Sequence, residues 1–176
     1  MLIAAQKKDE NIAEYMLYMW QIEDIIRSFN LNIDLIRKNI IDKFDQPDHV
    51  KKQIEEWYEN LIEMMHAEDF VEKGHLQINK NVMIALADLH LQLLKSPEEY
   101  SYSGIYFQTL PCIAELKMKA GEQKTEEIET CFSALYGILL LKLQGKPITE
   151  GTQKAIAQIS KLLAVLSEKY KQEKRK

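Results

Sequence analysis

Apolar residues recur along the chain at the three- and four-residue spacing of amphipathic helices, and no stretch keeps the apolar/polar alternation of a strand. The segment 9–29 carries one such stripe, made of Ile12, Met16, Met19, Ile22, Ile26 and Phe29. Residues 15–20 within it are apolar or aromatic on every face. The segment 125–145 is also apolar on most faces, so we expect these two helices to pack together at the centre.

Five further segments have helical spacing, at 33–44, 47–65, 78–95, 97–119 and 149–170. The sharpest helix start is Ser96-Pro97-Glu98-Glu99: Ser96 is the expected cap, Pro97 lies in the first turn, and Glu99 can reach back to the cap amide. Pro111 falls inside the helix that follows. Asn30, Thr125 and Thr149 are the caps expected for three other helices.

These segments predict an all-α fold: a bundle of about seven antiparallel helices, joined by short connections, with two central apolar helices. The length suits a single domain spanning 1–176. Residues 171–176 form a basic tail that we interpret as a frayed helix end, since cations there complement the helix dipole.

Charge and cysteine content narrow the partners and the compartment. The chain has 23 Lys and Arg against 27 Asp and Glu, a net charge of -4 that argues against nucleic acid as a partner. Cys112 and Cys131 lack zinc-type or redox-type spacing, and we interpret both as reduced. The longest apolar run, 135–141, is too short to span a membrane. Together these features predict a cytoplasmic protein without a membrane anchor.

Two Glu-x-x-His pairs raise the question of a dimetal centre, namely Glu63 with His66 and Glu72 with His75. Such centres need these pairs on separate helices that converge, together with two further glutamates. Both pairs lie in one stretch of the chain, and the second contains Gly74 at an expected helix end. The spacing therefore favours no metal site, and nothing in the sequence indicates a cofactor.

Histidines near the segment 78–95 give a second candidate for polar chemistry. His75 precedes this segment and His90 lies within it, and a folded arrangement could gather them with Asn79, Asn81 and Asp88 into a polar site. Asp88 and His90 are two residues apart, however, and point to different faces of a helix. No nucleophile with a partner emerges, and the chain has no Gly-rich phosphate loop or Gly-x-Ser-x-Gly elbow, so no residue is assigned as catalytic.

The central segment 9–29 also carries polar side chains that need partners. Glu14 and Tyr18 share a face, as do Glu23 and Arg27, which we interpret first as buried hydrogen bonding and an intrahelical ion pair. The functional alternative is a ligand pocket between the first and fifth expected helices. Its lining residues would be Glu14, Tyr18, Tyr102 and Tyr106.

Three stretches of the chain carry a resemblance to a known family. Residues 7–15 with 18–21, 74–81 and 129–137 read KKDENIAEY with YMWQ, GHLQINKN and ETCFSALYG. Together they resemble an uncharacterised bacterial family classed as a domain of unknown function, over nearly the whole chain. This resemblance implies a stand-alone helical protein of the bacterial cytoplasm, and it implies no activity, substrate or catalytic residue.

Two hypotheses of function follow. The first is a non-enzymatic helical module that binds a protein partner or its own copy, with Trp57 or Tyr58 as exposed aromatic anchors. The alternative is a small-molecule-binding protein or enzyme that uses the pocket around Glu14, Tyr18 and Tyr106.

Overall fold

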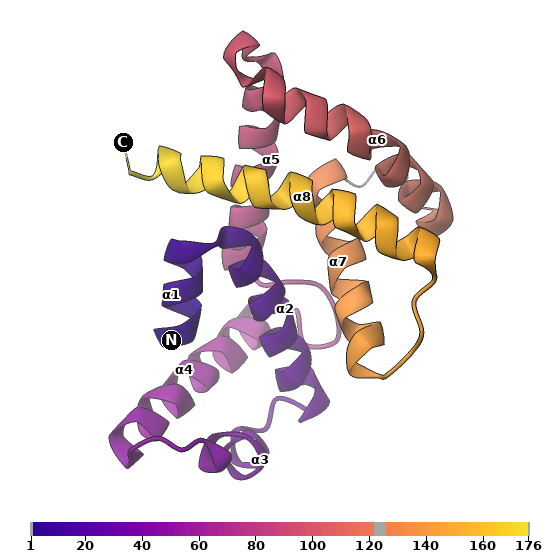
Figure 1. Ribbon diagram of the computed structural model, residues 1–176. Helices are drawn as coiled ribbons and strands as arrows, with labels where there is room; N and C mark the ends of the chain where they lie inside the picture. The colour runs from indigo at the N-terminus through magenta and orange to yellow at the C-terminus, as the bar shows by residue number, and fades with distance from the viewer. Residues whose placement is uncertain (1, 122–125, 176) are drawn as a thin grey trace.

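The computed structural model describes residues 2–121 and 126–175, and within these ranges the chain is helical with no strand. Eight α-helices and two 3-10 turns follow in the order α1 (Leu2–Glu10), α2 (Ile12–Ser28), α3 (Ile33–Asn39), η1 (Ile41–Lys43), α4 (Asp48–Ala67), α5 (Gln77–Lys95), η2 (Pro97–Glu99), α6 (Tyr100–Ala120), α7 (Glu127–Leu143) and α8 (Glu150–Glu173) (Figure 1). The all-α class is therefore confirmed. None of the helices in the described ranges is long and apolar enough to cross a membrane.

Asn11 separates the central helix, expected over 9–29, from a short helix before it that the sequence did not indicate. Its backbone is extended (φ -153°, ψ 102°), and its side-chain oxygen accepts hydrogen bonds from the amides of Ala13 at 3.0 Å and Glu14 at 3.2 Å. Asn is a strong N-cap because this oxygen replaces the missing backbone acceptor of the first helical turn. The chain therefore ends α1 at Glu10 and starts α2 at Ile12, and this additional helix brings the number in the described residues to eight, close to the expected number of about seven.

Two expected caps, Ser96 and Asn30, do not bond as the sequence indicated. Ser96 makes no side-chain capping bond, and the Glu99 carboxylate accepts a hydrogen bond from Lys169 at 2.6 Å instead of reaching back to the cap amide. The reason is that Pro97 starts a 3-10 turn, which aims Glu99 towards α8. Asn32, not Asn30, caps α3 by accepting from the Leu35 amide at 3.1 Å. Pro111 lies inside α6, as expected.

Helix α8 is longer than the sequence indicated. Thr149 caps it by accepting from the Thr152 amide at 3.3 Å, as expected, and the helix continues to Glu173. The basic segment assigned to a frayed end thus contributes its first residues to regular helix. Thr125, the cap expected for the segment 125–145, lies outside the described residues.

Helix α2 lies at the centre of the molecule and contacts α1, α5, α7 and α8 (Figure 1). Nine residues of α2 are buried. Helix α8 lies across α5 and α7. Helix α7 packs beside α2, as expected, but its fully buried residues, Ile128, Thr130, Cys131 and Phe132, all lie in its first half. The largest fully buried side chains of the core include Met16, Met19, Ile26, Ile36, Met65, Leu76, Leu86, Ile113 and Phe132. The uneven burial of α7 leaves its leucine-rich second half near the surface.

Candidate functional site

Glu23 of α2 is a carboxylate with no exposed surface. Its Oε1 accepts hydrogen bonds from the Leu76 backbone amide at 2.9 Å and from Asn79 Nδ2 at 2.7 Å, and its Oε2 lies 2.6 Å from His75 Nδ1. A carboxylate oxygen accepts, so Nδ1 of His75 carries the proton. Burial of this carboxylate is tolerated because three donors replace its lost hydration.

Arg27, one turn further along α2, holds the connection between α4 and α5. Its guanidinium donates to the backbone carbonyls of Phe70 at 3.2 Å and Gly74 at 2.5 Å, and it forms an ion pair with Asp24 at 3.1 Å. Instead of the expected ion pair between Glu23 and Arg27, each of these side chains forms its own hydrogen bonds to groups within residues 70–79. Each side chain binds polar groups that this connection would otherwise leave unpaired.

The connection between α4 and α5 positions His75 so that its ring stacks on the indole of Trp20. The two ring centroids are 4.2 Å apart and the planes differ by 11°. The edges of Trp20 also meet Phe132 and Tyr136 of α7, at centroid distances of 6.2 and 5.6 Å. The Tyr136 hydroxyl donates to Asp24 at 2.5 Å, and burial, followed by that bond, raises its pKa well above 10. His75 is thus fixed by Glu23 through Nδ1 and by Trp20 through its face.

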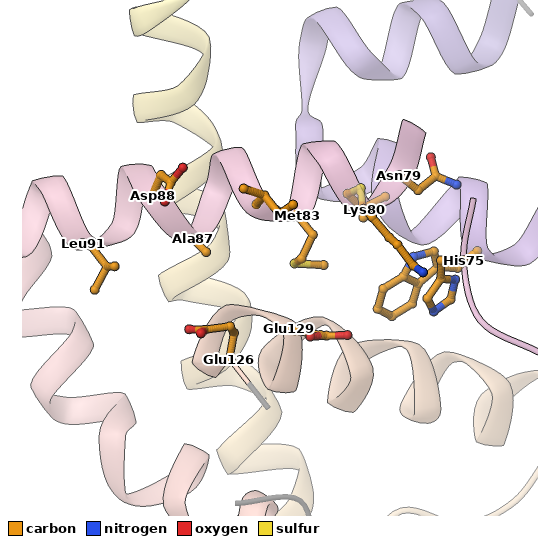
Figure 2. Close-up of a pocket in the computed structure, with 12 residues that line it drawn as sticks. His75, Asn79, Lys80, Met83, Ala87, Asp88, Leu91, Glu126 and Glu129 are labelled. Atoms are coloured by element: carbon orange, nitrogen blue, oxygen red, sulfur yellow. The ribbon is translucent and has the colours of Figure 1, made fainter. Parts of the chain in front are cut away.

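A pocket of about 420 Å³ opens beside this stack, between α2, α5 and α7 (Figure 2). Its apolar walls are Met16, Met83, Ile84, Ala87 and Leu91, together with Trp20. Its polar groups are His75, Asn79, Lys80, Asp88, Glu126 and Glu129. Figure 2 shows Glu126 and Glu129 projecting from α7 on the side that faces α5. Ligand pockets between helices commonly combine mostly apolar walls with a few polar anchors, as here.

Two buried polar atoms beside the pocket have no hydrogen-bond partner among the described residues. They are Nε1 of Trp20 and Oδ1 of Asn79. Asn79 is fully buried, and its amide nitrogen is engaged by Glu23. Unpaired buried polar atoms are rare in folded proteins and concentrate at functional or strained positions.

A second buried polar cluster lies at the other end of α5, around His90. Its Nδ1 is 2.6 Å from the Tyr102 hydroxyl, and its ring meets Tyr106 edge-on at 5.0 Å between centroids. Burial lowers the pKa of His90 below 6.5, against the opposing charge of Glu127, 3.8 Å from Nε2. Burial also raises the pKa of the neighbouring Cys131 thiol to about 12. His90, Tyr102, Tyr106 and Glu127 thus contact one another within this cluster.

The four residues expected to line a pocket lie in three different places. Tyr102 and Tyr106 are buried on α6 around His90. Glu14 is exposed and forms an ion pair with Lys7 at 2.8 Å. Tyr18 is half-buried, and burial raises its pKa above 10. None of the four lines the pocket beside His75.

The pocket instead contains part of the polar group expected near α5, namely His75, Asn79 and Asp88. Asp88 is exposed while His90 is buried, as the helix geometry indicated. Glu23 was assigned to an ion pair, and its central role was missed. The sequence did contain a signal that Glu23 is buried. This residue lies four positions after Met19 and three before Ile26, on the apolar stripe of α2.

The aromatic residues of α4 expected as anchors are less exposed than the sequence indicated. Tyr58 is buried at 3% exposure, and Trp57 is half-buried against the core. Tyr58 turns inward because it lies on the apolar face of α4, whereas Trp57 keeps part of its surface accessible.

The histidines of the two Glu-x-x-His pairs have different surroundings. His75 is engaged by Glu23, and His66 is exposed at the end of α4. Over residues 2–121 and 126–175, no group of three His, Cys, Asp or Glu side chains is arranged to hold a metal ion.

A family model described as a domain of unknown function, DUF4924, matches residues 1–176. The chain belongs to this family. The expected membership is thereby confirmed over the whole chain, and the Glu23–His75 arrangement is a feature of this DUF4924 protein. No curated protein and no solved structure matches it.

Proposed function

We propose that this protein binds a small molecule in the pocket between α2, α5 and α7. The observation that carries the proposal is the fixed His75: a fully buried carboxylate holds its Nδ1, and Trp20 supports its face at the pocket wall. Fixing the partly exposed imidazole of His75 in this way requires a carboxylate to be buried, which is energetically unfavourable. Pre-organised polar groups of this kind are typical of binding sites.

The size and lining of the cavity support the same proposal. About 420 Å³ is within the range of small-molecule sites. Ile84 and Leu91 line it and are 56% and 48% exposed, so a bound ligand would remove apolar surface from water.

The test is an amide-resolved NMR titration of the protein with a library of small aromatic and aliphatic fragments. We expect shifts confined to residues near Trp20, His75 and Ala87. The variant Ala87→Trp fills the pocket and should abolish them, whereas Ser133→Trp adds the same ring at an exposed position of α7 outside the pocket. Binding that survives Ala87→Trp, or no pocket shifts with any fragment, would contradict the proposal.

The second half of α7 supports a second candidate, a helical interaction module that associates with its own copy. Leu143 is 69% exposed, and residues 138–141, Ile-Leu-Leu-Leu, are only half-buried. Contiguous apolar side chains that remain partly accessible are typical of surfaces that become covered on association.

Analytical ultracentrifugation over a concentration series tests the second candidate. We expect a reversible dimer that Leu143→Glu dissociates, while Ile3→Glu, at an exposed apolar residue of α1, leaves it intact. A monomer at every concentration would contradict this candidate without affecting the pocket.

A further inference from the structure

The pocket between α2, α5 and α7 is lined by more negative than positive side chains. Asp88, Glu126 and Glu129 contribute three carboxylates, and Lys80 contributes the one ammonium group in the lining. None of the three carboxylates has an ion pair or side-chain hydrogen bond with another described residue. The negative charge of the pocket is therefore not neutralised within the described part of the chain.

The N-terminus of α7 compensates part of this negative charge but not all of it. Glu126 and Glu129 lie at the N-terminus of α7, where the helix dipole favours negative side chains. That dipole is equivalent to about half a positive charge, which is less than either carboxylate alone. Lys80 adds one positive charge, and its Nζ lies 3.8 Å from the ring centroid of Phe70, which is not a lining residue. A net negative field remains across the cavity.

The apolar wall lies on the opposite side of the same cavity. Ile84, Ala87 and Leu91 fall on one face of α5, at spacings of three and four residues. Figure 2 shows Ala87 and Leu91 across from the glutamates of α7. A ligand that fills the cavity thus meets methyl groups of α5 along one side and the carboxylates of Glu126 and Glu129 along the other, while the third carboxylate, Asp88, lies on α5 itself. Such a lining complements a molecule with an apolar body and a positive charge, and it repels an anion of the same shape.

We propose that the ligand of this pocket is a small organic cation with an apolar body, such as an aryl-alkyl amine. The inference rests on the proposed small-molecule function and adds the chemical class of the ligand. Glu126 and Glu129 bind the ammonium group, and the α5 face with Trp20 contacts the apolar body.

The test compares matched probes that differ in charge and share one ring system. Tryptamine is the cation, tryptophol the neutral control and indole-3-acetate the anion; phenethylamine, 2-phenylethanol and phenylacetate form a second series. Binding is measured by NMR titration and calorimetry on the full chain. We expect the amine to bind at least about tenfold more tightly than the acid, with the alcohol between them.

Variants locate the charge that makes this difference. Glu129→Gln and Glu126→Gln should each weaken tryptamine about two- to fivefold, as for partly exposed ion pairs. Lys80→Gln should strengthen it, since it removes the opposing charge. Glu63→Gln, on the exposed side of α4, removes an equal charge away from the pocket and should change nothing. Raising NaCl from about 0.05 to 0.3 M should reduce the preference for the amine.

The outcomes separate this inference from the proposed function. If pocket residues shift with probes of every charge equally, or most with the acids, the cation inference is wrong and small-molecule binding stands. If the amines bind more tightly than the acids but Glu126→Gln, Glu129→Gln and Lys80→Gln do not change their affinity, the assignment of the charge to these residues is wrong. If neither these probes nor any library fragment shifts pocket residues, both proposals fail together.

Discussion

Replacing Glu23 tests whether one buried carboxylate holds the α4–α5 connection against α2. Glu23→Ala leaves two buried donors, the Leu76 amide and Asn79 Nδ2, without acceptors, and it frees His75 from its partner. Each buried donor left unpaired costs about 1–3 kcal/mol, and the half-exposed His75 can turn to water. We therefore expect the free energy of unfolding to fall by about 3–5 kcal/mol.

Urea denaturation followed by circular dichroism measures this change, and hydrogen exchange of the Leu76 amide reports the local release. Glu23→Gln keeps the shape and one acceptor oxygen, so it should lose about 1–2 kcal/mol. Glu14→Ala is the matched control on the same helix: its ion pair with Lys7 is exposed, and its loss should cost less than about 1 kcal/mol.

The result that would refute this reasoning is a Glu23→Ala protein within about 1 kcal/mol of the original, with Leu76 still protected from exchange. The hydrogen bonds of Glu23 would then contribute little beyond what water supplies, and the connection would be held by packing alone.

Three further predictions use other local features. With iodoacetamide at about pH 8, half-exposed Cys112 should react in the folded protein, while buried Cys131, with its pKa raised to about 12, should react only after unfolding. Because burial lowers the pKa of His90, the folded state takes up its proton less readily than the unfolded state. Stability should therefore fall as the pH drops below about 6.5, and a His90→Gln variant should show a shallower fall in urea titrations at different pH values. Asn11→Ala should cost about 1 kcal/mol in thermal unfolding, since it removes the cap of α2; an unchanged midpoint would show that the break between α1 and α2 does not depend on the cap.

Much of the fold followed from periodicity, because helix formation depends on residues three and four apart in the sequence. The apolar stripe of α2, the cap at Thr149 and the position of Pro111 inside α6 are all local features of this kind. The error at the start of the chain was also local: Asn11 caps α2, so residues 2–10 form a separate helix that apolar spacing did not indicate.

The candidate site was harder to predict, because its bonds join distant parts of the chain. His75 and Asn79 were recognised as polar residues near α5, but Glu23 lies 52 residues before His75 and 56 before Asn79. Glu99 could have bonded within its own turn, and it bonds to Lys169 instead. A charged side chain takes the partner that tertiary packing brings within reach, and this choice is not encoded by spacing along one helix.

The sequence by itself determined the all-α class, most helix positions and the central place of α2, since these depend on local hydrogen bonding and on the period of apolar residues. Only the tertiary structure decided which carboxylate is buried, which histidine it holds and which side chains surround the pocket. The physical reason is that a pocket arises where three helix surfaces fail to fill the space between them, and that depends on how α2, α5 and α7 cross.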